Sequence, residues 1–359
     1  MILKNVKFKE KITDIQVKNG RFTHIGEGFE PDDEAKDGEG LKIIPGLIDI
    51  HAHGCLGYDT MEGGLPAMAA YELSHGITTW YPTTMTMAFE DIRRATEASI
   101  AGFRGAHIPG FHLEGPFIST KYKGAQNEAF IKAPTLELLR ECKNVKLITL
   151  APELAGSEEF IRSCGIVVAL GHTACDYDTA VRAFRAGATC LTHTYNAMSP
   201  MHHREPGPIP AAADCGAYAQ LISDGIHVHP AMVRLLFRLF GDERVVLISD
   251  SLRATGLGDG EFMFGGQKVI LKDGVARIES GAIAGSTTDL FECMRRAISF
   301  GIPEETAIRA ASENPARLMG LNKGKIEVGY DADFLLVTDD LRLKRVFLMG
   351  EEQIKNSEL

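Results

Sequence analysis

Histidine and carboxylate side chains of the kinds that bind divalent metal ions stand at the ends of apolar segments along the chain. They are His51, His53, Glu114, His172, His193 and Asp250. His51 and His53 are separated by one residue, so on a β-strand both imidazoles point to the same face. Imidazole and carboxylate are the usual ligands of catalytic zinc, which keeps one position open for water. Each histidine alone also fits a packed or surface role, but the set as a whole predicts a metal site.

A metal site of this composition suits the hydrolysis of an amide. A bound divalent ion lowers the pKa of water toward neutrality and polarises a carbonyl group. A carboxylate such as Asp250 could accept a proton from the attacking water and deliver one to the departing amine. The segment 249–251, Ser-Asp-Ser, is also good helix-capping chemistry, so an N-cap is the other role open to Asp250.

These residues converge only if the elements that carry them end at one edge. The sequence predicts strands at Gly46–His53, Ile77–Pro82, His107–Glu114, Val145–Ala151, Ile166–His172, Thr189–Thr194, Tyr218–Ser223 and Val245–Asp250. Several of them are continuous apolar runs, as expected for parallel strands buried on both faces. Helical patterns lie between them, for example at Phe89–Phe103 and Tyr177–Ala188. Eight such strands close a (β/α)8 barrel, whose active sites lie at the C-terminal ends of the strands. The sequence therefore predicts an α/β fold of the TIM-barrel type.

Both ends of the chain have a different character. Residues 15–17 and 22–25 form an alternating pattern around an Asn-Gly turn, and short β patterns recur at 325–328, 333–337 and 345–348. We expect the two ends to pair into a small β-sandwich domain made of residues 1–44 and 322–359, with the barrel over residues 45–321. A glycine-rich hairpin at about residues 260–280 interrupts the barrel pattern.

The composition limits the partners and the compartment. The chain has 359 residues, 45% of them hydrophobic and 24% charged, as in a globular protein. Its net charge of −10 argues against a nucleic-acid groove or an anionic membrane surface. The first ten residues lack the apolar run of a signal peptide, and no run of about 18 apolar residues follows. The 7 cysteines are scattered without a CxxC pair. We expect a cytoplasmic protein with reduced thiols.

The order of several short motifs gives a more specific indication. They are PGLIDIHAHG at 45–54, HLEGPF at 112–117, GHT at 171–173, HTYNAM at 193–198, REPG at 204–207, DGIH at 224–227, SDS at 249–251 and AGS at 284–286. In this order they resemble the N-acetylglucosamine-6-phosphate deacetylases, a family within the amidohydrolase superfamily. The resemblance runs from about residue 44 to residues 314–317. An HxH pair alone is weak evidence, whereas the ordered set is specific.

The resemblance implies a metal-dependent deacetylase that converts N-acetyl-D-glucosamine 6-phosphate to D-glucosamine 6-phosphate and acetate, with Asp250 as general base and acid. It implies one or two divalent ions per subunit. The principal ion would be held by Glu114, His172 and His193, with Asp250 beside it. The retained His51 and His53 predict a second ion, bridged to the first by Glu114. We expect zinc, although such ligands also accept iron, manganese and cobalt.

The resemblance also implies how the substrate is held. Arg204 and His227 match the positions that bind the sugar 6-phosphate, and the fork of an arginine suits phosphate oxygens. Contacts to the sugar near the amide would come from Ala125, Asn196, Ala197, Ile283, Ala284 and Gly285. The phosphate clamp of this family can draw on a neighbouring subunit, so we expect a homodimer.

Two other functions stay open on the sequence. The first is an amidohydrolase that acts on a cyclic amide or another N-acetylated amine, which would be favoured if Arg204 and His227 pointed away from the metal. The second is a catalytically silent barrel that senses a sugar phosphate. The complete set of candidate ligands argues against the second function, because a degenerate relative usually loses at least one of them.

Overall fold

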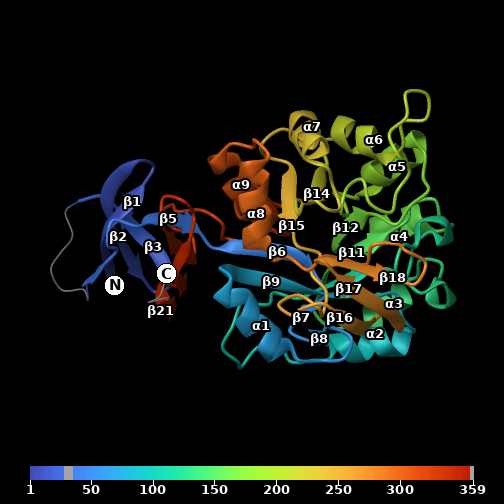
Figure 1. Ribbon diagram of the computed structural model, residues 1–359. Helices are drawn as coiled ribbons and strands as arrows, with labels where there is room; N and C mark the ends of the chain where they lie inside the picture. Colours follow the sequence, from blue (N-terminus) through green and yellow to red (C-terminus); the bar gives the residue numbers. More distant parts are fainter. Residues whose placement is uncertain (28–34, 356–359) are drawn as a thin grey trace.

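The barrel forms the right-hand part of the structure in Figure 1, and the terminal strands lie to its left. The structure is a computed structural model that describes residues 1–27 and 35–355. The parallel sheet of the barrel has eight strands in the order β15-β14-β13-β12-β11-β10-β9-β6. The strands are β6 (Leu47–Ala52), β9 (Ile77–Thr84), β10 (Phe111–Glu114), β11 (Val145–Leu150), β12 (Val167–Leu170), β13 (Cys190–Leu191), β14 (Tyr218–Ile222) and β15 (Val245–Ile248). Each lies inside or overlaps a predicted strand, so the predicted TIM-type fold is confirmed.

The strands are apolar on both faces because each face packs against a different layer. In β15, Val246 and Ile248 belong to a cluster inside the barrel, whereas Val245 and Leu247 pack toward the helices. The helices are α1 (Leu65–Ser74), α2 (Phe89–Thr96), α3 (Leu136–Glu141), α4 (Ser157–Ser163), α5 (Tyr177–Ala186), α6 (Pro208–Asp214), α7 (Pro230–Phe240), α8 (Leu290–Ser299), α9 (Glu304–Ala311) and α10 (Glu313–Met319). The helix predicted at 89–103 is too long: α2 ends at Thr96, and Gly102 has a φ of 87° that an α-helix does not allow.

The two ends of the chain form one further sheet, and their strands lie side by side in blue and red at the left of Figure 1. Its strands are β1 (Ile2–Phe8), β2 (Lys11–Lys18), β3 (Arg21–Ile25), β4 (Ala35–Asp37), β5 (Lys42–Pro45), β19 (Phe334–Val337), β20 (Leu343–Leu348) and β21 (Glu351–Lys355). Strand β5 pairs antiparallel with β19 and so joins the beginning of the chain to its end. Phe22, Phe334 and Phe347 pack in the hydrophobic core of this terminal sheet.

The strand predicted at 325–328 is wrong, because the chain turns there. Gly324 and Gly329 both have a positive φ, and the Tyr330 amide donates to the Glu327 carbonyl. The division into domains 1–44 with 322–359 and 45–321 stays a prediction. Parts of it, residues 28–34 and 356–359, lie outside the described residues.

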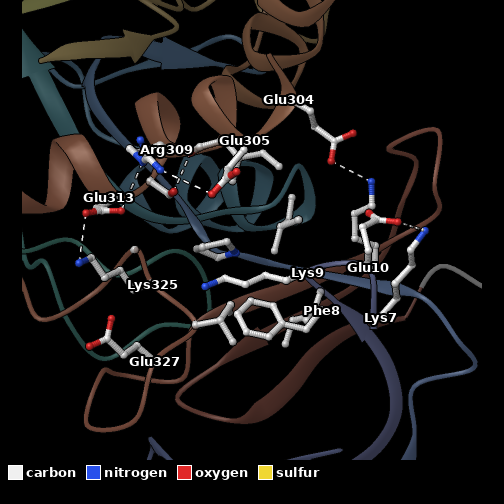
Figure 2. A pocket seen from close by; sticks show the side chains of 18 residues that line it. Lys7, Phe8, Lys9, Glu10, Glu304, Glu305, Arg309, Glu313, Lys325 and Glu327 are labelled. Carbon is white, nitrogen blue, oxygen red and sulfur yellow. Dashed lines mark hydrogen bonds and ion pairs between the residues drawn. The ribbon is translucent and has the colours of Figure 1, made fainter. Parts of the chain in front are cut away.

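A groove of about 700 Å³ lies where the terminal sheet meets the barrel helices (Figure 2). Basic and acidic side chains line it together and pair with one another. Lys42 of β5 reaches Glu304 of α9 at 2.8 Å, and Lys325 reaches Glu313 at 3.1 Å. Figure 2 shows Arg309 between Glu305 and Glu313. Of these pairs, Lys42–Glu304 joins strand β5 of the terminal sheet to helix α9 of the barrel.

The predicted hairpin at 260–280 is a small antiparallel sheet inserted between β15 and α8. It consists of β16 (Gly260–Phe264), β17 (Gln267–Lys272) and β18 (Val275–Ile278). No helix within the described ranges is both long and apolar enough to cross a membrane. All the cysteines are free thiols.

Candidate metal centre and active site

The Glu114 carboxylate at the end of β10 is the point on which the candidate ligands converge. Its Oε1 lies 3.2 Å from Nε2 of His51, 3.2 Å from Nε2 of His172 and 3.1 Å from Nε2 of His193. Its Oε2 lies 3.3 Å from Nε2 of His53. All these side chains are buried. The residues come from four strands of the barrel, and all lie at the C-terminal mouth, as the barrel fold predicts.

The ring nitrogens that face this centre carry lone pairs. The Nδ1 atoms of His172 and His53 each lie within hydrogen-bond distance of a backbone carbonyl, Tyr122 at 2.9 Å and Thr83 at 3.2 Å. A carbonyl only accepts, so each Nδ1 carries a proton, and in the neutral ring each Nε2 is free to act as a ligand.

Two further observations show that a cation fits the centre. The Nε2 atoms of His172 and His193 are 3.1 Å apart, a distance at which both cannot carry protons. Nε2 of His51 is buried without a hydrogen-bond partner among the described residues. Two groups of ligand atoms are close enough to hold an ion each: His51, His53 and Glu114, and Glu114, His172 and His193. The shared Glu114 is therefore placed to bridge two ions.

The negative charges of the Glu114 and Asp250 carboxylates also favour a bound cation. Burial favours the neutral ring of His53, but the carboxylates of Asp250 and Glu114 outweigh burial and raise the pKa of His53 above its usual value. Burial opposes ionisation of Asp250, yet His51 and His53 hold the pKa of its carboxyl below the usual range. Oδ1 of Asp250 lies 3.3 Å from Nε2 of His53. Asp250 is thus an ionised carboxylate beside the ligand cluster, and no helix starts at it.

Three of these residues adopt a left-handed backbone at the point where a strand ends. The φ angles are 46° at His172, 27° at His193 and 51° at Asp250. This conformation is unfavourable for residues with a Cβ atom, by about 1–3 kcal/mol each, and is concentrated at functional sites. The turn swings each side chain out of the strand direction and into the mouth.

A cavity of about 360 Å³ opens above the cluster. Most of the predicted substrate residues line it: Ala125, Asn196, Ala197, His227, Ile283 and Gly285. Ala284 is fully buried and packs against the small sheet instead. Arg204 lies on the exposed segment 201–205, outside the cavity lining, with its Nη1 2.7 Å from Nε2 of His203. The fold of one chain therefore does not bring Arg204 to the site.

His227 is held at the cavity wall by a buried carboxylate. Its Nδ1 donates to Oδ2 of Asp224 at 2.6 Å, and the same carboxylate accepts the backbone amides of Ile226 and His227. Burial lowers the tendency of this ring to protonate, but Asp224 outweighs it and raises the pKa of His227. The ring can thus carry a positive charge at the cavity wall.

Several residues of the site have no signal in the sequence. Gln126 donates to Oε2 of Glu114 through its Nε2 and accepts the Thr86 amide at 2.7 Å through its Oε1. Phe264 of the small sheet packs on His53 with ring centroids 5.3 Å apart. An isolated glutamine or phenylalanine forms no pattern along a chain, and only the fold brings these two to the mouth.

His112 lies beneath the centre rather than at it. Its Nε2 is 2.8 Å from Oγ1 of Thr149, and its ring packs on that of His51 with centroids 4.6 Å apart. His51 in turn donates from Nδ1 to Oε1 of Gln220 at 3.1 Å, which leaves Nε2 for the centre. A hydrogen-bonded floor of this kind orients the ligands above it.

Comparison with known proteins agrees with this geometry. The amidohydrolase family matches residues 43–352, most of the chain. The chain therefore belongs to the amidohydrolase family.

Individual relatives identify a narrower group within the amidohydrolase family. The N-acetylglucosamine-6-phosphate deacetylase of Bacillus subtilis is 39% identical over 320 residues, covering 83% of this chain and 81% of the relative. The crystal structure of the deacetylase of that name from Mycobacterium smegmatis has a TM-score of 0.90 at 32% identity, covering 99% of this chain and 100% of that one. A mutant of the latter, solved in complex with N-acetyl-D-glucosamine-6-phosphate, has a TM-score of 0.89 at 31% identity and covers 98% of both chains. Within its family the chain thus stands among these deacetylases, as its motifs predict.

Proposed function

We propose that this chain hydrolyses the N-acetyl amide of N-acetyl-D-glucosamine 6-phosphate and releases D-glucosamine 6-phosphate and acetate. The observation that carries the proposal is the convergence of four imidazoles on the Glu114 carboxylate at the floor of a cavity whose wall holds His227. A relative of the same fold was solved with this phosphorylated sugar bound, which supports the choice of substrate.

The proposed ligands are those the sequence predicts: Glu114, His172 and His193 for one ion, and His51, His53 and Glu114 for a second, with Asp250 beside both. A divalent ion held there supplies a Lewis acid that favours ionisation of water and polarises an amide carbonyl. Zinc suits the imidazole and carboxylate donors, and iron, manganese or cobalt would be accepted by the same set.

The remaining chemistry falls to Asp250. As an ionised carboxylate at the mouth, it accepts a proton from the water that attacks the amide carbon. The C–N bond of the resulting adduct then breaks, and Asp250 returns the proton to the departing amine. The neutral amide substrate and water thereby become the free amine of the sugar and acetic acid, which releases a proton to become acetate. Asn196, Ala197 and the backbone of Ala125 and Ile283–Gly285 would hold the sugar next to this group.

We propose further that His227 binds the 6-phosphate and that Arg204 completes the clamp from a second copy of the chain. His227 stands in the cavity with a raised pKa, whereas Arg204 lies on an exposed segment away from the cavity of its own chain. An arginine presented outward in this way can reach the mouth of a partner subunit in a homodimer.

The first experiment is to measure acetate release from N-acetylglucosamine 6-phosphate by the metal-loaded protein, with the unphosphorylated sugar in parallel. We expect rapid release that depends on the phosphate and that stops when a chelator removes the metal. Equal rates on both sugars would contradict the roles of His227 and Arg204. No release from either sugar, with metal bound, would leave an amidohydrolase with a different substrate, to be sought among cyclic amides and other N-acetyl compounds.

A further inference from the structure

The barrel is not closed by a strand ladder. In the described part of the chain, β6 and β15 are the two ends of the eight-stranded sheet, and no regular pairing joins them. They nevertheless lie side by side (Figure 1). At the mouth, three single hydrogen bonds cross the seam between β6 and β15. The Asp250 amide donates to the His51 carbonyl at 2.9 Å, and the amides of His53 and Gly54 donate to the Ser251 carbonyl at 2.8 Å and 3.2 Å.

Deeper in the seam, one carboxylate replaces the missing ladder. Asp49 of β6 is fully buried. Its Oδ1 accepts the backbone amide of His51 on its own strand at 3.0 Å, and its Oδ2 accepts the backbone amide of Ser249 across the seam at 3.2 Å. Both amides lie where a strand neighbour would otherwise supply a carbonyl. An unpaired buried backbone amide is strongly unfavourable, so this carboxylate is the group that lets the two strands meet.

The two amides that Asp49 accepts lie in or next to residues of the proposed active site. The amide that Asp49 holds on β6 belongs to His51, and the amide that it holds on β15 directly precedes Asp250. Across the seam, Nε2 of His51 lies 3.5 Å from Oδ1 of Asp250. The spacing of the two strands therefore sets the distance between the HxH pair and the proposed proton acceptor.

We propose that Asp49 is a positioning residue that fixes the His51/His53 half of the metal centre relative to Asp250. The inference rests on the proposed two-ion centre. Asp49 itself touches none of the ligand side chains or the cavity. Its oxygens bond to the backbone amides of His51 and Ser249 and to the side chain of Ser249, so it governs geometry and not proton transfer.

The test is a cobalt titration of metal-free protein, followed by calorimetry and by the visible absorption of bound Co²⁺. For the unaltered chain we expect two binding steps. In Asp49→Asn one oxygen is replaced by an NH2 group that cannot accept the amide on β6 or β15, so the seam opens locally. We expect the second step to weaken by about 10–100-fold, the range for loss of an outer group that orients ligands. The first step, at Glu114, His172 and His193, should stay unchanged, and kcat should fall while KM stays the same.

Asp289 offers a matched control. It is also a largely buried carboxylate, but its Oδ1 accepts the Glu292 amide at the start of α8, at 2.8 Å, and bonds to neither seam strand. Asp289→Ala should lower the melting temperature through loss of the cap and leave both cobalt steps as they are. A merely structural role for Asp49 would give the same result in Asp49→Asn.

The outcomes separate cleanly. Two wild-type binding steps in Asp49→Asn would overturn the proposal. A single step, or none, in the unaltered chain would instead refute the two-ion centre on which it rests. If Asp49→Asn is too unstable to purify, Asp49→Glu takes its place. Its carboxylate keeps both acceptors but displaces the strands by one methylene, so the second step should again weaken, and an unchanged second step would overturn the proposal.

Discussion

At the scale of single residues, the site depends on two carboxylates whose surroundings keep them ionised for different purposes. Asp250 faces the imidazoles of His51 and His53, and Asp224 faces the ring of His227. In both cases burial opposes the charge and the neighbouring rings outweigh it, so the pKa of each carboxyl lies below the usual value. Asp250 is therefore unprotonated and can accept a proton. The unprotonated Asp224 favours the protonated form of the His227 ring.

Replacement of Asp250 by asparagine should separate binding from turnover. The amide keeps the shape of the side chain but cannot accept a proton, so kcat should fall by about 10²–10⁴-fold, the usual contribution of general acid–base catalysis. Affinity for the phosphorylated sugar, measured by calorimetry, should change little. Asp176→Asn is a suitable control, because Asp176 caps α5 outside the cavity and asparagine caps equally well. Undiminished turnover in Asp250→Asn would remove Asp250 from the mechanism.

The pairing of Asp224 with His227 predicts how KM depends on pH. A protonated His227 attracts phosphate. Its raised pKa keeps the ring protonated at pH values above 6.5, the usual pKa of histidine. KM should therefore be low below the raised pKa and should increase as the pH rises through it. Besides Asp224, the Asp250 carboxylate also favours the charged ring, and Arg296 bonds to the Asp224 carbonyl.

Asp224→Asn removes the main group that holds the proton, while burial still favours the neutral ring. The rise in KM should then begin at a lower pH, with kcat at saturating substrate little affected. The measurement is KM as a function of pH for both forms of the protein, with the unphosphorylated sugar as a control that should show no such shift. Superimposable KM profiles would show that His227 does not bind the phosphate through its charge.

At the scale of elements, the segment that leads from the small sheet to α8 packs against the backbone of Asp250. Gly285 has a φ of 58°, and a Cβ atom added there would lie 2.9 Å from the Asp250 carbonyl oxygen. Gly281, with a φ of 87°, has open space around the same position. The two glycines share the backbone strain that a side chain would suffer and differ in what that side chain would meet.

Gly285→Ala and Gly281→Ala therefore form a matched pair. Both should lose about 1–2 kcal/mol of unfolding free energy from the left-handed backbone. Only Gly285→Ala should displace the backbone of Asp250, and a misplacement of this kind can lower kcat by about 10²-fold. Chemical denaturation and acetate release on the two variants test this. Equal kcat values would show that the segment does not support Asp250.

The elements were predicted where a physical pattern runs along the chain. Buried parallel strands are continuous apolar runs, which is why β12 and β15 were recognised together with His172 and Asp250, the polar residues that follow them. Strand β21 was missed because its sequence Glu-Glu-Gln-Ile-Lys is polar and lies on an edge. The role of Gln126 could not be predicted, because it arises from contacts across the mouth. Arg204 was assigned to the site by its motif, whereas the structure places it outside the cavity of its own chain.

At the scale of the whole molecule, the placement of Arg204 predicts complementation between two inactive variants. In a mixed dimer of Arg204→Ala with Asp250→Asn, one of the two sites would have both wild-type residues if the clamp crosses the interface. Random exchange of subunits should then recover about a quarter of the wild-type activity. Recovery should be measured after mild dissociation and remixing, with each variant alone as control. No recovery in a mixture shown to contain mixed dimers would mean that Arg204 acts within its own chain.

The pairing of β5 with β19 has a consequence for the order in which the protein is made. Strand β5 leaves the ribosome early, and its partner follows only after the whole barrel has been synthesised, on the order of tens of seconds later. During that interval the edge of β5 has no neighbour of its own chain on that side, and an open edge favours pairing with other molecules. The barrel is therefore synthesised while the terminal sheet is still incomplete. Slower translation of the barrel should increase aggregation of nascent chains, which can be measured as the amount of pelleted protein.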